Sequence, residues 1–300
     1  MTDPNSRTLE AGDREIEIGH ADKLLFPDDG ISKFDLADYY ARIAPMALRH
    51  YRDRALTMHR FPDGIGEDGF FQKQIGDYFP DWIDRVTLAK KDGEVTYVVA
   101  DKAATLVYLA DQGCITPHLS LSRNDKPNHP DRMIFDLDPS DEDFGKVRKA
   151  ARHLKDALDR LGLASFVQTT GSRGLHLLVP LDRTADFQAV RDFAHQLCER
   201  VAESAPELMT VEQRKKKRGQ RVFLDYLRNA YGQTSVGPYA VRAKPGAPIA
   251  TPVRWDEVDA DLDPRAYRLD NIFRRLSKVS DPWADIARHG ARLPAVSDIP

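Results

Sequence analysis

Segments of strand and helix periodicity alternate along the chain, most clearly between residues 133 and 227. Apolar residues at spacings of three and four predict two amphipathic helices, over 144–161 with Gly162 at its end, and over 187–205. Short apolar runs predict strands over 166–169, 175–180 and 222–226. With the apolar run that begins near residue 133, the order is strand, helix, hairpin, helix, strand. This order predicts an α+β sandwich with the helices on one face of a sheet.

The first 120 residues show shorter predicted elements. Ser32 fits the N-cap of a helix that continues to residue 50. Pro-Asp-Gly at 62–64 predicts a turn between two extended segments, and Lys91-Asp92-Gly93 predicts a hairpin turn before a strand over 95–100. Further expectations are a polar N-terminal arm over 1–20 and a helix over 105–112.

Composition limits the class of protein without identifying it. With 300 residues and 41% apolar content, the chain suffices for one large domain or two small ones with a packed core. Apolar runs stay well short of the roughly 18 residues that a membrane span needs, and the N-terminus is polar. We therefore expect a protein that is neither secreted nor membrane-bound. The net charge of −3 does not by itself indicate nucleic-acid binding. Evidence for such binding must therefore come from local clusters of charged residues.

A pair of aspartates follows an apolar run in the middle of the chain. Asp136 and Asp138 stand one residue apart, before Pro139. On a strand they would face the same side, where two carboxylates repel each other unless a cation lies between them. Asp225 ends a second apolar run far downstream. Three carboxylates at two strand ends suit a two-metal site for phosphoryl transfer. The alternative for the pair alone is a strand end followed by an Asp-Pro turn.

A glycine-rich turn lies between the two strands of the predicted hairpin. Its sequence TTGSRGLH, over 169–176, places a hydroxyl and a guanidinium between two glycines, so backbone amides can approach a ligand closely. Such a turn suits a triphosphate, with hydroxyls, amides and the strand histidine donating to phosphate oxygens. The candidate ligands are Thr170, Ser172, Arg173 and His176. The alternative is an ordinary glycine-rich hairpin with one histidine on its strand.

Six cations fall within residues 214–221, RKKKRGQR, directly before the strand that ends at Asp225. Positive charge there could neutralise a triphosphate or track a DNA backbone. Arg242 follows on a strand-like segment and could reach the same site. The alternative is a solvated basic loop.

Phe70 and Phe71 are adjacent and follow a glycine-rich loop. On a strand, one ring would face the core and the other would face solvent, where it could stack on a nucleic-acid base. The alternative is that both rings fill a core.

Two further motifs are weaker. Lys90-Lys91-Asp92-Gly93 matches the KxDG motif of nucleotidyltransferase DNA ligases, but its flanks predict a hairpin. The segment FDLDPS resembles the nucleophile motif of haloacid-dehalogenase phosphatases, but Ser140 is only a partial match and no convincing paired-aspartate motif follows.

Taken together, three motifs resemble the polymerase domain of bacterial ligase D, a non-homologous end joining polymerase of the archaeo-eukaryotic primase superfamily. They are FDLDP, TTGSRGLHLLVPL and VFLDYLRNAYGQTSVGPYAVRAKPGAP, and ADKLLFP, HRFPDG and FFQK resemble its N-terminal part. The resemblance implies one α+β primase-polymerase domain over 1–300. Its catalytic core, about 130–285, would have an RRM-like antiparallel sheet with helices packed on it. An N-terminal α/β subregion, about 20–120, would contact DNA ends and template.

The resemblance also assigns roles at the predicted site. Asp136, Asp138 and Asp225 would hold two divalent metal ions, with Mn²⁺ preferred and Mg²⁺ possible. The family commonly has serine at position 170 and lysine at 173, and the Thr hydroxyl and the Arg charge preserve those properties. Contacts to the incoming nucleotide would come from His118, Thr170, Ser172, Arg173, His176, Arg218 and Arg242.

On the DNA side, the resemblance implies that Lys23 and Lys33 grip the 5′-phosphate of a downstream strand, and that Phe70 and Phe71 stack on template bases. Arg60 and Lys73 complete the predicted DNA contacts. His59 stands where the family often has a lysine, which weakens position 59 as a DNA contact.

The function implied is a template-directed, DNA-dependent nucleotidyltransferase, a primase-like polymerase. It would fill gaps and extend DNA ends with NTPs or dNTPs, with a tendency to incorporate ribonucleotides, in double-strand-break repair by end joining. Expected partners are gapped DNA with a 5′-phosphate, an end-joining ligase, fused or separate, and a Ku-type end-binding protein. The expected location is cytoplasmic, in bacteria and nucleoid-associated, without a membrane partner. Two alternatives remain: a non-catalytic module that bridges DNA ends, which needs the lysines and rings but not all three aspartates, and a primase that makes primers.

Overall fold

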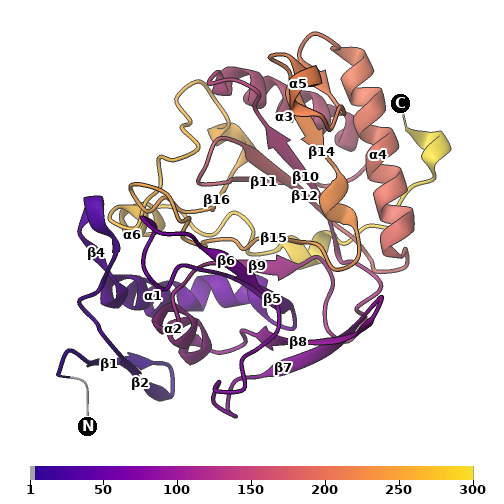
Figure 1. Ribbon diagram of the computed structural model, residues 1–300. Helices are drawn as coiled ribbons and strands as arrows, with labels where there is room; N and C mark the ends of the chain where they lie inside the picture. Colours follow the sequence, from indigo (N-terminus) through magenta and orange to yellow (C-terminus); the bar gives the residue numbers. More distant parts are fainter. Residues whose placement is uncertain (1–3, 300) are drawn as a thin grey trace. The chain divides into compact units, whose positions relative to one another are not determined.

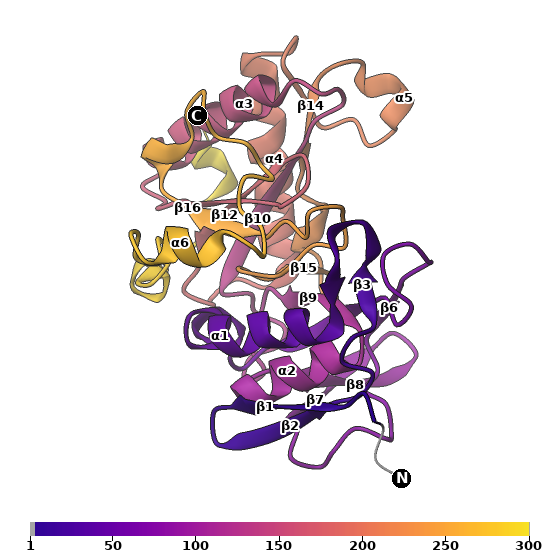
Figure 2. The same ribbon diagram turned by 90° about the vertical axis from the view of Figure 1, so that its left-hand side faces the viewer.

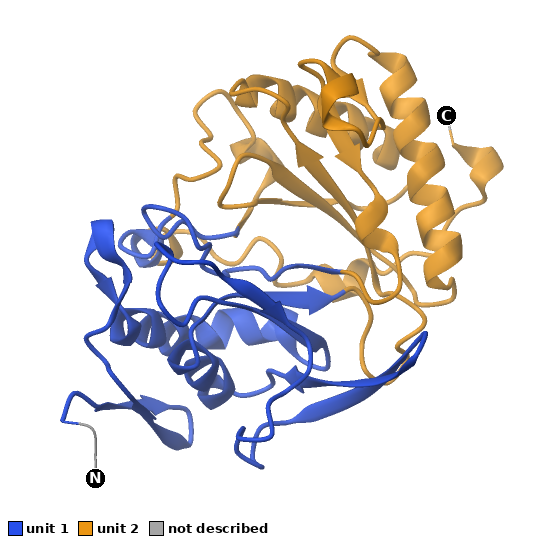
Figure 3. Cartoon of the chain, in the orientation of Figure 1, with its two compact units in different colours: residues 1–120, 234–250, 268–274 blue, residues 121–233, 251–267, 275–300 orange. Residues whose placement is uncertain are grey.

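The computed structural model describes residues 4–299, and these fall into two compact units (Figure 3). Of the described residues, unit 1 consists of 4–120, 234–250 and 268–274, and unit 2 of 121–233, 251–267 and 275–299. Within residues 4–299, no helix combines the length and apolar character that crossing a membrane requires. A single domain with subregions over about 20–120 and 130–285 stays a prediction.

Unit 2 is built on a six-stranded sheet (Figure 1). Neighbouring strands are antiparallel except for the β13–β14 pair, which is parallel. The sheet and the helices on it confirm the predicted α+β core. In sheet order the strands are β13 (Met209–Thr210), β14 (Val222–Asp225), β10 (Arg132–Asp138), β12 (Leu175–Pro180), β11 (Phe166–Thr169) and β16 (Thr251–Val253).

Alternation along β10 divides its side chains between the two faces of this sheet. Met133, Phe135 and Leu137 belong to the main core of unit 2, together with apolar residues of helices α3 (Phe144–Arg160) and α4 (Phe187–Ser204). Both helices begin at an aspartate N-cap that accepts a hydrogen bond from a backbone amide of the first turn. The residues between these core positions, Asp136 among them, therefore face away from the helices.

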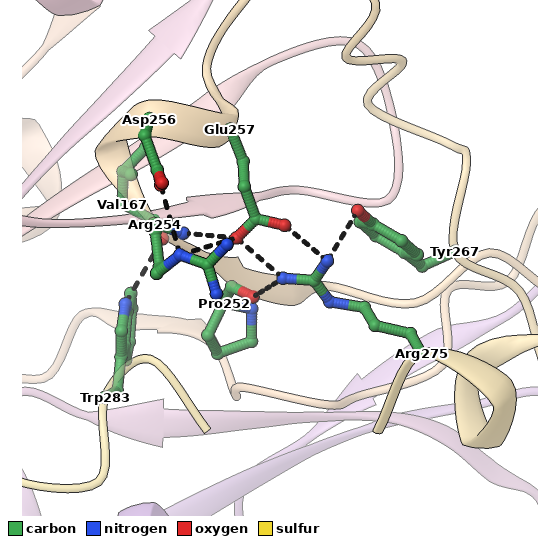
Figure 4. A network of polar contacts seen from close by, with 8 residues as sticks. All are labelled: Val167, Pro252, Arg254, Asp256, Glu257, Tyr267, Arg275 and Trp283. Atoms are coloured by element: carbon green, nitrogen blue, oxygen red, sulfur yellow. Dashed lines mark hydrogen bonds and ion pairs between the residues drawn. The ribbon is translucent and has the colours of Figure 1, made fainter. Parts of the chain in front are cut away.

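A network of polar contacts ties the C-terminal part of unit 2 to the β11–β16 edge of the sheet (Figure 4). Arg275, on helix α6 (Ile272–Leu276), donates to the Glu257 carboxylate at 2.5 and 2.9 Å and to the Tyr267 hydroxyl at 2.8 Å. Trp283 donates its indole N–H to the carbonyl oxygen of Val167 on β11, at 3.2 Å. Burial raises the pKa of Glu257, but hydrogen bonds from Arg275 and the Arg254 amide outweigh it and hold that pKa below its ordinary value.

Arg275→Met is expected to lower the free energy of unfolding by about 3 kcal/mol, because it leaves a largely buried carboxylate without its partner. The side chains of Arg275 and Glu257 are 9% and 18% exposed. Urea denaturation at pH 7 measures the loss. Because the folded pKa of Glu257 is depressed, its contribution is present at neutral pH and is lost as the pH falls through that value.

Arg254→Met is the matched control, because the Arg254 side chain is 51% exposed, pairs with Asp256 at 3.1 Å and lies 4.0 Å from the Glu257 carboxylate, much farther than Arg275. An exposed ion pair contributes at most about 1 kcal/mol. Equal losses for the two variants would contradict the importance of the buried pair.

Unit 1 contains a second mixed sheet-and-helix arrangement. Its main sheet has the order β15 (Thr234–Val236), β9 (Cys114–Ser120), β5 (Ala55–Arg60), β8 (Gly93–Val99), β7 (Arg85–Lys90), and β6 (Phe70–Gln72) joins it through β5. Helices α1 (Lys33–Tyr51) and α2 (Ala103–Asp111) pack against each other, and α2 also contacts β9 (Figure 2). Ser32 caps α1 in a reciprocal capping box with Asp35, as predicted. The short pair β3 (Leu24–Phe26) and β4 (Ile31–Ser32) precedes α1.

Two N-terminal expectations have different outcomes. The expectation of a polar arm over 1–20 leading into a strand is wrong, because β1 (Arg7–Ala11) and β2 (Arg14–Ile18) form a hairpin that turns at Gly12 with φ +73°. Its buried side includes Ala11, Ile16 and Ile18, an alternation that the many charged residues between them obscure. Residues 1–3 of the expected arm lie outside the described residues. The hairpin at Lys91-Asp92-Gly93 is confirmed, because β7 pairs with β8 up to Lys90 opposite Gly93.

Candidate metal centre and its neighbours

The two central strands of unit 2 bring three predicted carboxylates together. The β10–β14 register places Asp136 opposite Asp225 and Asp138 opposite Phe223. One carboxylate oxygen from each of Asp136, Asp138 and Asp225 lies within 4.8 Å of the others. Their convergence follows from antiparallel pairing of two strands whose acidic residues share one face, opposite the helices. Closely spaced carboxylate oxygens are the donor set that Mg²⁺ and Mn²⁺ prefer.

The electrostatics of the trio fit a cation. Burial, and then the neighbouring Asp136 carboxylate, raise the pKa of Asp138 to about 6. Burial also raises the pKa of Asp225; a hydrogen bond from the Leu227 amide opposes this, and the Asp136 charge adds to it. Both raised pKa values mean that desolvation and mutual repulsion disfavour the ionised forms of these carboxylates in the folded chain. A divalent cation among these oxygens relieves both.

His176 lies directly beside the trio. It faces Asp136 in the β10–β12 register, and its Nε2 is 3.2 Å from Asp136 Oδ1. Its Nδ1 is 3.3 Å from the amide nitrogen of Gln168, the residue opposite it on β11. The imidazole ring of His176 thus lies between the Asp136 carboxylate and the Gln168 side-chain amide. Gln168 is not among the residues predicted from the sequence; the available signal was a polar residue inside the apolar run FVQT, at the position that pairs with His176.

The Thr170 hydroxyl is used within the glycine-rich turn. It accepts hydrogen bonds from the amides of Ser172 at 3.3 Å and Gly174 at 3.2 Å, and lies 3.1 Å from the Gly174 carbonyl oxygen. The Ser172 carbonyl accepts from Arg265 Nε at 2.8 Å. Arg173 is half-exposed, with its guanidinium 3.8 Å from the Glu142 carboxylate. The hydroxyl thus shapes the loop, while phosphate contacts by Ser172, Arg173 and Thr170 stay predictions.

Arg218 differs from the rest of the basic run. Its side chain is buried, donates to the carbonyl oxygens of Glu212 and Gln213 at 2.8 Å, and lies 3.7 Å over the Phe223 ring. Its charge also acts to lower the pKa of Asp138 and of Asp225. The alternative of a solvated loop therefore fits the exposed lysines of α5 (Lys215–Arg218) but not Arg218.

Asn229 is a second buried residue that the sequence analysis missed. Its side-chain amide bonds both the amide and the carbonyl of Ile134 on β10, at 2.8 and 2.7 Å, and also donates to the Tyr226 carbonyl. Beside it, Asp225 Oδ1 accepts from the Leu227 amide at 2.7 Å. These bonds fix the chain after β14 against β10 and so position Asp225.

Unit 1 carries the predicted DNA contacts. Lys23 Nζ pairs with Asp63 at 2.6 Å, and Lys33 Nζ pairs with Asp111 at 3.3 Å. The Lys33 amide donates to the Lys23 carbonyl at 2.8 Å, so the two residues are backbone neighbours across the turn. His118, on β9, and Arg242 also belong to unit 1. Their contact with a nucleotide, like the DNA contact of exposed Lys73, stays a prediction.

The expectation that one of the two adjacent phenylalanine rings faces the core is wrong, and so is the alternative that both do. Phe70 is 46% exposed and Phe71 is 60% exposed. The reason is that β6 is a three-residue strand attached to the sheet through β5, and neither of its faces is packed into a core. The Arg60 guanidinium next to them donates to Gln112, Gln72 and Tyr78, at 2.7–2.8 Å.

Comparisons with known proteins agree with this geometry. Residues 32–283 match the family model described as "LigD, primase-polymerase domain". Over 280 residues the chain is 32% identical to the multifunctional non-homologous end joining DNA repair protein LigD of Mycobacterium tuberculosis, covering 90% of this chain and 37% of that protein. It is 34% identical to the LigD protein of Pseudomonas aeruginosa, covering 97% of this chain and 34% of that protein. The chain thus spans little more than a third of the length of these relatives.

A solved structure is also similar. It is described as the polymerase domain from Mycobacterium tuberculosis ligase D in complex with DNA. The TM-score is 0.85 at 31% sequence identity, and the match covers 92% of this chain and 99% of that one. The similarity in fold therefore extends over nearly the whole polymerase domain.

Proposed function

Because the chain belongs to the LigD primase-polymerase domain family, we propose that it is a template-directed nucleotidyltransferase acting on DNA ends and gaps. It would fill gaps and extend ends with NTPs or dNTPs, with ribonucleotides favoured, during double-strand-break repair by end joining. The observation that carries the proposal is the meeting of Asp136, Asp138 and Asp225 within 4.8 Å on adjacent strands. A module that only bridges DNA ends has no use for this partly buried, mutually repelling trio.

The residues around the trio would each have a distinct task. Two divalent cations held by the three carboxylates would supply activation of a primer 3′-hydroxyl and neutralisation of the departing pyrophosphate. His176 would orient the Asp136 carboxylate through its Nε2, and Gln168 would hold the imidazole ring in place through its Nδ1. The buried guanidinium of Arg218 adds positive charge near the phosphates. The amides of the glycine-rich loop would bind phosphate oxygens.

A ligase partner is suggested by the names and the length of the relatives. Those proteins are named as multifunctional non-homologous end joining proteins, and the chain spans 34–37% of their length. We propose that a ligase activity, fused or separate, seals the strand that this chain extends, and that a Ku-type protein delivers the ends.

A gap-filling assay tests the proposed function. The substrate is a duplex with a short gap and a 5′-phosphate on the downstream strand, supplied with Mn²⁺ and either NTPs or dNTPs. We expect templated addition at the primer 3′ end, faster with NTPs. Duplex binding without addition under any of these conditions would favour the bridging module. Product formation without any primer would favour a primer-making primase.

Lys23→Glu is expected to abolish the preference for a phosphorylated gap. The side chain of Lys23 is 37% exposed, so it can leave Asp63 to meet a phosphate, whereas Lys33 is buried against Asp111 and its replacement would unfold this corner. Losing a charge-assisted contact and adding a like charge should weaken binding of the phosphorylated gap by about tenfold or more. Binding of phosphorylated and unphosphorylated gaps is compared by fluorescence anisotropy.

The control is Lys91→Glu, the same charge change at the exposed tip of the β7–β8 hairpin. It should keep the preference for the 5′-phosphate. A wild-type protein that binds both gaps equally would rule out this role for Lys23.

A further inference from the structure

Each exposed ring of β6 is held by one residue of β5. The strand register places Arg60 opposite Phe70 and His59 opposite Phe71. The Arg60 guanidinium lies 5.6 Å from the centre of the Phe70 ring. His59 instead stacks flat on Phe71, with ring centres 4.1 Å apart and planes 8° from parallel. The two rings thus have different kinds of partner.

The imidazole covers one face of the Phe71 ring. His118 adds an edge-on contact to Phe71 with ring centres 5.3 Å apart, and Phe61 lies with its ring centre 4.5 Å from that of His59. Even so, 60% of Phe71 stays exposed. A three-residue strand attached through β5 constrains such a ring weakly, so the stack with His59 supplies the constraint.

His59 carries no charge at neutral pH. Burial and the charge of Arg242 lower the pKa of His59 to about 4. A neutral ring parallel to Phe71 cannot act as the phosphate-binding cation that a lysine at this position would provide. The geometry of the stack gives residue 59 another task.

We propose that His59 is a positioning residue that holds Phe71 so that the other face of this ring stacks on an unpaired template base. The proposal rests on the proposed function, in which Phe71 contacts the template. The arrangement is a three-layer stack of imidazole, phenyl ring and base. It fixes where the template base lies without reading which base it is, because every base has a flat face.

The test uses a gapped duplex with the fluorescent base 2-aminopurine as the first unpaired template base, whose emission falls when it stacks. Phe71→Ala should lose this quenching and bind the duplex about tenfold or more weakly. His59→Ala should lose most of the quenching and bind about three- to tenfold more weakly. His59→Phe, a neutral ring of similar size, should stay within about twofold of the wild type. Circular dichroism checks that each variant is folded.

The salt dependence of binding separates stacking from charge. The logarithm of the binding affinity falls linearly with the logarithm of the salt concentration. If His59 acts by stacking, the slope of this line is the same for the wild type and for His59→Ala. For a phosphate contact, the slope of the variant would be shallower by about 0.9. A shallower slope, or full quenching by folded His59→Ala or by His59→Lys, overturns the proposal.

The proposed function and the proposed role of His59 can be refuted separately. A wild-type protein that neither quenches the probe nor extends the primer refutes the proposed function and this inference together. A wild-type protein that does both, with His59→Ala equal to it in quenching and affinity, refutes only the role of His59.

Discussion

Asp225→Asn is expected to abolish templated extension while leaving DNA binding intact. The substitution keeps the shape of the side chain and an oxygen that can accept the hydrogen bond from the Leu227 amide. It removes one of three carboxylates that meet within 4.8 Å. Losing a metal ligand forfeits several kcal/mol of transition-state stabilisation, so single-turnover extension should fall by about a thousandfold. The predicted DNA contacts, Lys23 and Phe71 among them, are unchanged.

The stability of this variant should move in the opposite direction from its activity. Burial raises the pKa of Asp225 above its ordinary value, so the ionised carboxylate destabilises the metal-free folded state at neutral pH. Because the folded pKa of Asp225 is raised, the contribution of this group to stability is most favourable at low pH and is lost as the pH rises through that value. The neutral amide escapes this penalty. Without metal at pH 7, the urea concentration at the unfolding midpoint of Asp225→Asn should therefore be at least as high as that of the wild type.

Asp156→Asn is the matched control, because it makes the same chemical change at an exposed position of α3. It should extend primers at the wild-type rate. An Asp225→Asn protein that extends primers as fast as this control would show that residue 225 does not serve the chemistry.

Gly174→Ala is expected to destabilise the protein and to inactivate it. A Cβ at this position would lie 2.2 Å from the carbonyl oxygen of Leu137, a backbone atom of β10 one residue before Asp138. The amide and carbonyl of Gly174 are both bonded to Thr170, so the loop cannot simply move aside. Overpacking of this kind costs about 2–3 kcal/mol of unfolding free energy. A shift of the loop by about 1 Å would cost about a hundredfold in rate.

Urea denaturation and primer extension measure the two effects of Gly174→Ala. The control is Gly66→Ala, because no heavy atom of the described residues lies within 4 Å of the added Cβ and its φ is not positive. This control should keep its activity and gain up to about 1 kcal/mol, because alanine restricts the unfolded chain. Wild-type stability in Gly174→Ala would contradict the close approach of the loop to β10.

The strands and helices of unit 2 could be predicted because their patterns are strong. The bounds 166–169 and 175–180 match β11 and β12, and the aspartate trio follows from two strands that end in acidic residues. Antiparallel pairing then needs no further information to bring Asp136 next to Asp225.

Other features depend on contacts between distant residues, and the sequence carries little trace of them. The N-terminal hairpin is hard to recognise in the sequence, because charged residues alternate with its buried isoleucines. The exposure of Phe70 and Phe71 depends on what packs against β6, which a local pattern does not encode. The pairing of Gln168 with His176 becomes visible only once the hairpin register is known.

The most direct test of the metal centre is anomalous diffraction from crystals grown with Mn²⁺ and a non-hydrolysable NTP. We expect Mn²⁺ bound directly to carboxylate oxygens of Asp136, Asp138 and Asp225. At saturating Mn²⁺ and with nucleotide bound, anomalous peaks only elsewhere, or none near these three side chains, would contradict this expectation.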